Sequence, residues 1–249
     1  MLFLFCTTVY AQNIKVAYKQ TFNYDLQGVS PLYLFVDAKL NKSVLLRDFT
    51  KEVTYAGDKP SVQTDFYVTL DRTIPYDYIY LDKANKKMDM YEDFASKVYK
   101  ILDVFPEISW QLVNESKEIN KIKVLKAVGK YRGKTWEVWY APSIPYSFGP
   151  WKLNGLPGLI LDAKETDGNI FYQAENIEYN VVCDICEPPT EKVLKEITLK
   201  DFLIIQDDFY NNIEADLPRG TTVKYEKKSI LSTETEFEFP TKFRWEADY

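Results

Sequence analysis

The amino-acid sequence predicts a mainly β protein: a single strongly curved antiparallel sheet or half-open barrel, with one helix in the C-terminal half. Three observations lead to this fold class. Aromatic residues make up 16% of the 249 residues while Gly is sparse, at nine, and aromatic side chains favour a pleated, half-buried surface. Apolar and polar residues alternate over most of the chain, as in strands with one buried face. A single late segment has helical periodicity.

The N-terminal half is a series of alternating segments without helix-length apolar periodicity. Residues 31–49 hold two apolar runs on either side of Asn41-Lys42-Ser43, whose polar side chains suit a hairpin turn. Consecutive strands joined by short turns predict a meandering antiparallel sheet. The other strands expected in this half cover residues 14–22, 64–70, 76–82, 86–94 and 96–103.

The centre of the chain continues with two further hairpins. Residues 131–134 separate two alternating runs between residues 121 and 142, and therefore suit a hairpin tip. Asp167-Gly168 is a strong short-range turn signal between the two apolar runs of residues 158–181. Both hairpins extend the same antiparallel sheet.

The strand expected after Lys134 has one core face and one mixed face. Side chains alternate across a strand, so Trp136, Val138 and Tyr140 share one face, while Glu137 and Trp139 point the other way. We therefore expect Trp139 on the mixed face.

One helix is predicted, at residues 199–216. Thr198 and Asp201 resemble a capping box at its start, and Pro218 and Gly220 end the run. Such an apolar stripe usually marks a face that packs on a sheet. From Thr221 the sequence returns to alternation, as in one more strand. The apolar positions at helical spacing are Leu199, Phe202, Leu203, Ile205, Phe209 and Ile213.

Residues 1–11 are an apolar run that we expect to be an export signal, which leaves residues 12–249 as one β-rich mature domain. The run ends in the small-residue pattern that a signal peptidase accepts. Cys6 raises the alternative of a lipid anchor, but Phe5 stands where a small residue is needed. No other stretch approaches the roughly 20 apolar residues that span a bilayer. We therefore expect a periplasmic or envelope protein without an integral membrane segment.

Charge and composition exclude several classes of function. The formal net charge of −6 argues against electrostatic attraction to nucleic acid or to an anionic membrane surface. The sequence contains no His, which removes every Ser/His, Cys/His or His-ligated metal site. No cofactor is expected.

Cys183 and Cys186 form a C-x-x-C pair in the predicted mature chain. With no second pair and no His, four zinc ligands cannot be completed within the chain. An oxidising envelope favours a local disulfide. The following Glu187, Pro188 and Pro189 disfavour the helix start at which a redox-active dithiol normally sits. A structural disulfide is the preferred interpretation, with redox chemistry and a metal shared with a partner as alternatives.

Residues 148–161, "FGPWKLNGLPGLIL", combine prolines of fixed φ with glycines of free φ, so they are not a regular strand. One interpretation is an ordered crossover that Trp151 anchors against the sheet. The other is a binding loop, with Trp151 and Pro157 exposed beside a groove. The structural motif would be Gly149, Pro150, Gly155, Gly158, Leu159 and Ile160. The binding residues would be Trp151, Leu153, Leu156, Pro157 and Trp139.

The block from Lys126 to Leu161, and above all "GLPGLI" at Gly155–Ile160, resembles the GLPGLI family of exported proteins in Gram-negative bacteria. The resemblance extends from about Asn13 to Tyr179, so residues 180–249 are a less family-like C-terminal extension. It implies a β-rich envelope protein of unknown function with no established catalytic residues. Members of this family often accompany outer-membrane transporters.

Two hypotheses about function follow. The first is a non-enzymatic envelope protein that binds an apolar or peptide ligand, or that assists an outer-membrane transporter or another envelope protein; a concave sheet lined by aromatic residues suits such a ligand. The second is a periplasmic enzyme, either a dithiol oxidoreductase that uses Cys183 and Cys186 or a carboxylate-based hydrolase. No carboxylate pair in the sequence is brought to the separation that a glycosidase needs, and no catalytic residue is assigned.

Overall fold

The structure is a computed structural model that describes residues 13–23, 27–50, 54–56, 72–212, 237–238 and 242–243. The expected export signal at residues 1–11 and the expected strand at residues 64–70 lie outside this set. So do residues 213–216 of the expected helix. Among the described residues, no helix has the length and apolar character needed to cross a membrane.

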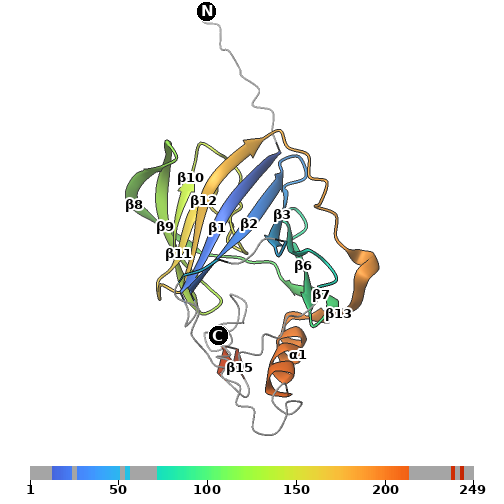
Figure 1. Cartoon of the computed structure of the whole chain (residues 1–249). Coiled ribbons are helices and arrows are strands. Elements are labelled where there is room, and N and C mark those ends of the chain that lie inside the picture. The colour runs from blue at the N-terminus through green and yellow to red at the C-terminus, as the bar shows by residue number, and fades with distance from the viewer. Residues whose placement is uncertain are drawn as a thin grey trace, which may run out of the picture.

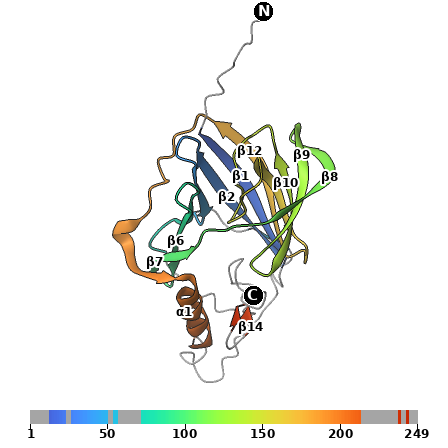
Figure 2. The ribbon, with the colours of Figure 1, turned by 180° about the vertical axis from the view of Figure 1, so that it is seen from behind.

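Most of the described strands belong to one strongly curved, open sheet (Figures 1 and 2). Their order across the sheet is β13-β7-β6-β5-β3-β2-β1-β12-β11-β10-β9-β8, with β4 beside β2. This arrangement confirms the predicted fold class. The strands are β1 (Ile14–Asn23), β2 (Gln27–Asp37), β3 (Lys42–Asp48), β4 (Thr54–Ala56), β5 (Tyr76–Asp82), β6 (Lys87–Phe94), β7 (Lys97–Val104), β8 (Trp110–Ile119), β9 (Ile122–Tyr131), β10 (Lys134–Ala141), β11 (Leu159–Glu165), β12 (Ile170–Tyr179) and β13 (Val193–Thr198). A separate pair joins β14 (Phe237–Glu238) to β15 (Lys242–Phe243).

The predicted hairpins form, and one of them turns earlier than expected. Arg132 and Gly133 have φ of 55° and 67° between β9 and β10, and Gly168 has φ of 79° between β11 and β12, as tight hairpin turns require. The β2–β3 turn covers residues 38–41, and Lys42 already belongs to β3. The reason is the Asp37 carboxylate, which accepts the backbone N–H of residues 39 and 40 at 2.9 Å each and so begins an Asx turn.

The helix α1 (Leu199–Asn212) begins at the predicted cap. The backbone N–H of Asp201 donates to the Thr198 hydroxyl oxygen at 3.1 Å, and that hydroxyl donates to the Asp201 carboxylate at 2.8 Å. Phe202 is buried against Phe94 and Tyr99 of the sheet. Ile205 and Phe209 are half-buried on the same side. The apolar stripe therefore packs on the sheet, as predicted.

One pair of strands departs from the expected antiparallel arrangement. β13 lies parallel to β7 at one edge of the sheet. Parallel neighbours need a long connection rather than a tight turn. The connection through residues 180–192 runs from the end of β12 outside the sheet to its far edge (Figure 1), so β13 enters beside β7 in the same direction.

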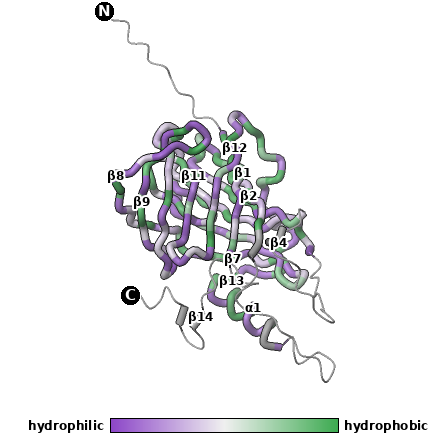
Figure 3. Tube along the Cα trace, turned by 60° about the vertical axis from the view of Figure 1, so that its left-hand side comes forward, coloured by the Kyte–Doolittle hydropathy of each residue, from purple (hydrophilic) through white to green (hydrophobic). Residues whose placement is uncertain are grey.

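Hydrophobic and hydrophilic residues alternate along many of the strands (Figure 3), and successive side chains of a strand point to opposite faces of the sheet. On the concave face, one core lies under the segment between β10 and β11, and a second core lies under α1. A third cluster, rich in tyrosine, lies on the opposite face. In that cluster Tyr78 stacks on Tyr80, with ring centroids 5.8 Å apart, and Tyr91 meets both rings edge to face.

A buried ion-pair cluster connects the two ends of the sheet. The connection from β7 to β8 spans the open side of the curved sheet in both views (Figures 1 and 2). At its start, the Asp103 carboxylate pairs with Lys152 at 2.8 Å and with Arg132 of the β9–β10 turn. The Lys152 side chain is 0% exposed and that of Asp103 is 5% exposed. We call these three residues the Asp103 cluster.

The pKa of Asp103 lies below the usual value for an Asp carboxyl group. Burial alone would raise the pKa of Asp103, but the Lys152 and Arg132 cations and their hydrogen bonds outweigh burial and hold the pKa below its usual value. A carboxyl whose folded-state pKa is depressed stabilises the fold above its unfolded-state pKa, and that contribution is lost as pH falls through the folded-state pKa.

The segment between β10 and β11 approaches β10 so closely at Gly158 that no side chain fits. A Cβ at Gly158 would lie 2.3 Å from the carbonyl oxygen of Ala141 and 2.6 Å from its carbon. Both are backbone atoms, which cannot turn aside as a flexible side chain could. The bend between Ala141 and Leu159 therefore requires Gly at this position.

We predict that Gly158→Val lowers the free energy of unfolding by about 1–3 kcal/mol, because the backbone of β10 must move to admit the side chain. Chemical denaturation monitored by circular dichroism measures the change. Pro157→Ala is the control, since Pro157 is exposed in the same segment and its replacement is expected to cost less than about 1 kcal/mol. Equal stability of Gly158→Val and the parent protein would refute the close approach.

We predict that Asp103→Asn lowers the free energy of unfolding at pH 7 by about 3–5 kcal/mol, because the buried Lys152 and Arg132 cations lose the carboxylate that pairs with both of them. In the parent protein, the contribution of Asp103 is present above about pH 4 and declines as pH falls further; the variant lacks this decline. Urea denaturation at several pH values measures both effects. Glu107→Gln removes an exposed ion pair from the same connection and is expected to change stability by less than about 1 kcal/mol. Similar losses in the two variants would contradict the prediction.

Candidate functional site

The candidate site lies on the concave face, between its two apolar cores. The first core is built mainly on β1, β2 and β9–β12 and also includes Leu45 of β3, Leu81 of β5 and Met88 of β6. The second core is built on β6, β7, β13 and α1. Ile79 of β5 is half-buried and packs against both. Beside these apolar residues, Arg47 of β3, Asp77 of β5 and Glu92 of β6 occupy inward positions that belong to neither core.

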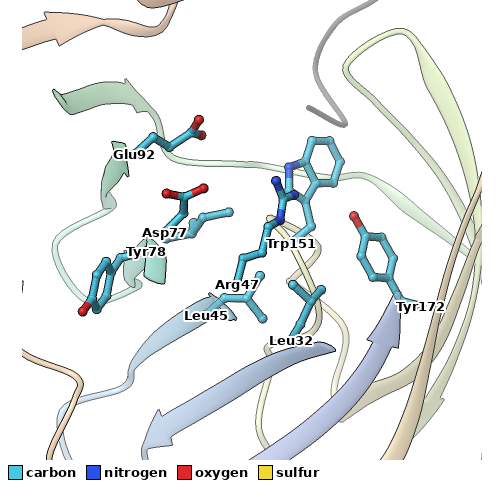
Figure 4. Close-up of a pocket in the computed structure, with 9 residues that line it drawn as sticks. Leu32, Leu45, Arg47, Asp77, Tyr78, Glu92, Trp151 and Tyr172 are labelled. Atoms are coloured by element: carbon cyan, nitrogen blue, oxygen red, sulfur yellow. The ribbon is translucent and has the colours of Figure 1, made fainter. Parts of the chain in front are cut away.

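A small cavity occupies this position (Figure 4). Its volume is about 30 Å³, which is room for about two water molecules. The lining combines aliphatic, aromatic and charged residues. The residues that line it are Leu32, Leu45, Arg47, Asp77, Tyr78, Ile79, Glu92, Trp151 and Tyr172.

Strand alternation explains why charged residues reach the cavity. Leu45 and Arg47 lie two positions apart on β3 and share one face. By the same spacing, Asp77 shares a face with Ile79 on β5. The Tyr78 ring points away from the cavity in Figure 4 and belongs to the tyrosine cluster on the opposite face. The polar part of the cavity is therefore formed by the inward face of β3, β5 and β6.

The charges around the cavity are partly paired. The Asp77 carboxylate accepts a hydrogen bond from Arg72 and one from the backbone N–H of Asp93, the latter at 3.2 Å. Burial raises the pKa of Asp77, and the Arg72 and Arg47 cations offset only part of that effect. Arg47 faces Asp77 across the β3–β5 pair without a hydrogen bond or ion pair to it among the described residues.

Trp151 forms the opposite wall of the cavity. Its ring centroid lies 5.3 Å from that of Trp136 and 5.4 Å from that of Tyr131, and Tyr172 stacks on Trp136 with ring centroids 6.0 Å apart. Only 3% of Trp151 is exposed. Its φ is 53°, a conformation that costs a bulky residue about 1–2 kcal/mol. The packing of its ring holds Trp151 in this conformation beside the cavity.

The other residues of the sequence-predicted site have different positions. Leu153 and Leu156 are buried in the first core, while Pro157 is exposed. Trp139 lies on the opposite face of the sheet, as its strand position predicts, with the Lys117 and Lys126 ammonium groups 4.5 Å and 5.7 Å from its ring centroid. The structure therefore does not bring Trp139 together with Trp151.

The glycines and their neighbours hold the crossover in place. Gly155 has φ of 101°, and a Cβ at Gly149 would lie 2.7 Å from the Cβ of Ile160. The backbone N–H of Ile160 donates to the Phe148 carbonyl at 3.0 Å. Pro150, Leu159 and Ile160 are buried. These contacts make the segment an ordered crossover whose inner surface includes Trp151.

The cysteine pair lies apart from the cavity. Cys183 and Cys186 form a disulfide with their Cα atoms 5.4 Å apart, in the connection between β12 and β13. The Tyr80 hydroxyl donates to the Cys186 carbonyl at 2.9 Å, which attaches this connection to the tyrosine cluster. Within the described part of the chain, no group of three His, Cys, Asp or Glu side chains is placed to hold a metal ion.

Sequence analysis missed three charged residues of the cavity, namely Arg47, Asp77 and Glu92. The signal was present, because each occupies an inward position two residues from an apolar residue on the same strand. Which inward positions border a cavity depends on where the crossover and α1 end, and strand spacing contains no such information.

Comparison with known proteins gives one family match. A family model described as "Protein of unknown function (Porph_ging)" matches residues 81–162, that is, 82 of the 249 residues. This stretch begins in β5, ends in β11 and contains the whole crossover. No curated protein matches the chain.

Among solved structures, the chain is similar to PNGF-II in two crystal forms. The first has 18% identity over 79% of this chain and 33% of PNGF-II, with a TM-score of 0.52. The second has 20% identity over 80% and 33%, with a TM-score of 0.49. An uncharacterized conserved protein from Thermus thermophilus has 7% identity over 75% of this chain and 91% of its own, with a TM-score of 0.39. This chain spans about a third of the length of PNGF-II, and at this identity the likeness concerns the fold alone.

Proposed function

We propose that this protein is an exported, non-enzymatic protein of the cell envelope that binds an apolar or peptide ligand on the concave face of its open sheet. The single observation that carries the proposal is the cavity between the two concave-face cores. One wall is aliphatic and aromatic, with Leu32, Leu45, Ile79 and Trp151, and the floor carries charged groups. A lining that places a few polar groups among apolar side chains is found in ligand sites.

The proposal includes a location in the cell envelope and a relationship to the GLPGLI family. The apolar run at residues 1–11 with its cleavage pattern supports export, and the resemblance of "GLPGLI" to the exported family of that name supports an accessory role beside an outer-membrane transporter or another envelope protein. The family match of residues 81–162 agrees with a domain of unknown function.

The enzymatic alternative has less support. A dithiol oxidoreductase would need Cys183 and Cys186 at a helix N-terminus, and they lie in an irregular connection before β13. For a carboxylate-based hydrolase, the carboxyl group with a raised pKa at the cavity is Asp77, and that group already accepts two hydrogen bonds. Neither the family match nor the solved structures support an enzymatic activity.

We predict that Ile79→Gln weakens binding of an apolar ligand about tenfold, because the lost apolar contact is worth roughly 1.4 kcal/mol. Fluorescence titration with the neutral apolar dye N-phenyl-1-naphthylamine measures the change. Native mass spectrometry of the protein purified from the envelope then identifies what it retains from the cell.

Leu112→Gln is the matched control, since Leu112 is 60% exposed on β8 and loses the same kind of side chain away from the cavity. Unchanged binding by this variant is expected. If the parent protein neither binds the dye nor retains a ligand, and no envelope partner co-purifies with it, the proposed function is wrong.

A further inference from the structure

β8 lies at one edge of the sheet, and its outer side is open (Figure 2). The strand pairs with β9, and no other strand of the described residues pairs with it. An edge strand presents unpaired backbone N–H and C=O groups, on which a strand of another chain can form a ladder. β8 has ten residues, whereas β13 at the opposite edge has six. Residues 114–118 of β8 are all exposed, so the longer of the two edges is accessible to a second chain.

Two oppositely charged side chains, Glu115 and Lys117, lie on the same face of this edge strand. The Lys117 ammonium group lies 4.5 Å from the ring centroid of Trp139. The Glu115 carboxylate pairs at 3.2 Å with Lys126, whose ammonium group lies 5.7 Å from the same centroid. Both charges are therefore on the face of the sheet that carries Trp139. The exposed fractions of the two side chains are 53% for Glu115 and 40% for Lys117.

Both charged groups have capacity for a further partner. Lys126 is shared between Glu115 and Glu137, at 3.2 Å from each carboxylate, so it supplies less than one positive charge to Glu115. Lys117 pairs with Asp162 at 2.9 Å, and an ammonium group has three donors. A second pair of opposite charges next to β8 would thus add to these contacts without breaking them.

We propose that two copies of this chain pair edge to edge through antiparallel β8 strands, about a two-fold axis at Ser116; this inference goes beyond the proposed function and does not depend on it. Dimers of identical chains are most often two-fold symmetric, with one surface patch contacting its own copy. An axis perpendicular to the sheet at Ser116 places Glu115 opposite Lys117 of the partner subunit, and Lys117 opposite Glu115 of the partner subunit. Opposite charges at directly facing positions stabilise a strand pair.

The charge pattern of β8 selects this position of the axis. An axis at Glu115, Lys117 or Glu118 would place that residue opposite its own copy, and like charges directly opposite are destabilising. An axis at Asn114 would leave Glu115 and Lys117 opposite uncharged residues. The axis at Ser116 is therefore the one that uses both charges.

A bulge in β8 limits the extent of the contact. Val113 pairs with Lys126 of β9, and Ser116 pairs with the next residue, Leu125, so β8 carries additional residues between them. A bulge bends its strand and disrupts the ladder locally. The new ladder is thus short, and the dimer is expected to depend on concentration, as small interfaces do. In such a contact the two charge pairs contribute a large share.

Sedimentation velocity of the full-length protein, up to about 1 mM, tests this pairing. The expected result is a monomer in exchange with a dimer. Glu115→Lys and Lys117→Glu each turn two attractive pairs into two repulsive ones, so each should raise the dimer Kd at least about tenfold.

The double variant Glu115→Lys/Lys117→Glu is the decisive measurement. It restores opposite charges across the axis, so its Kd should return to within about threefold of that of the parent. Within one chain, the same two changes bring like charges together at Lys126 and at Asp162. Recovery of the dimer can therefore come only from the pairing between chains.

Glu191→Lys and Lys195→Glu are the charge-matched controls, because both residues are exposed outside β8 and change the net charge equally. Their Kd values should equal that of the parent. The proposal is overturned if the parent stays monomeric up to about 1 mM, if either single variant in β8 dimerises as the parent does, or if the double variant does not recover. Assembly beyond a dimer that these variants leave unchanged would also overturn it. Circular dichroism checks that each variant is folded.

Discussion

The arrangement of the concave face depends on one buried carboxylate, that of Asp103. β7 and β8 lie near opposite ends of an open sheet, and no ladder of hydrogen bonds joins them. Asp103 instead attracts Lys152 from the crossover and Arg132 from the β9–β10 turn. A fully buried Lys is costly without a counter-ion, so crossover and connection are stable in this position only together. That pairing holds the crossover against the connection that spans the open side of the sheet.

The crossover serves the fold and the cavity with the same residues. Gly158 lets it approach β10, and Leu153 and Leu156 bury it in the first core. Trp151 has a strained φ, and its ring packs against Trp136. Backbone strain of this kind persists where the surrounding packing enforces it. The distinction between a structural crossover and a binding loop is therefore not exclusive, because a rigid segment can provide one wall of a site.

The cavity exists because the concave face carries two apolar cores that do not merge. Leu45 of β3 and Leu81 of β5 are buried in the first core, whereas the inward positions of Arg47 and Asp77 belong to neither core. Both charged residues line the cavity and are half-buried. The cavity is therefore lined by charged groups on β3, β5 and β6 and by buried apolar residues on its other side.

The sequence by itself determined the mainly β class, most hairpins and the start of α1, because alternation, turn residues and caps act between neighbours in the chain. It also determined which face Trp139 occupies. Tertiary structure alone decided that β13 pairs in parallel with β7, that Asp103 meets Lys152, and that Arg47 borders a cavity. Each of these contacts joins segments that are distant in the sequence. The curvature of the sheet and the course of the crossover bring those segments together, and no local pattern of residues encodes the curvature or the course.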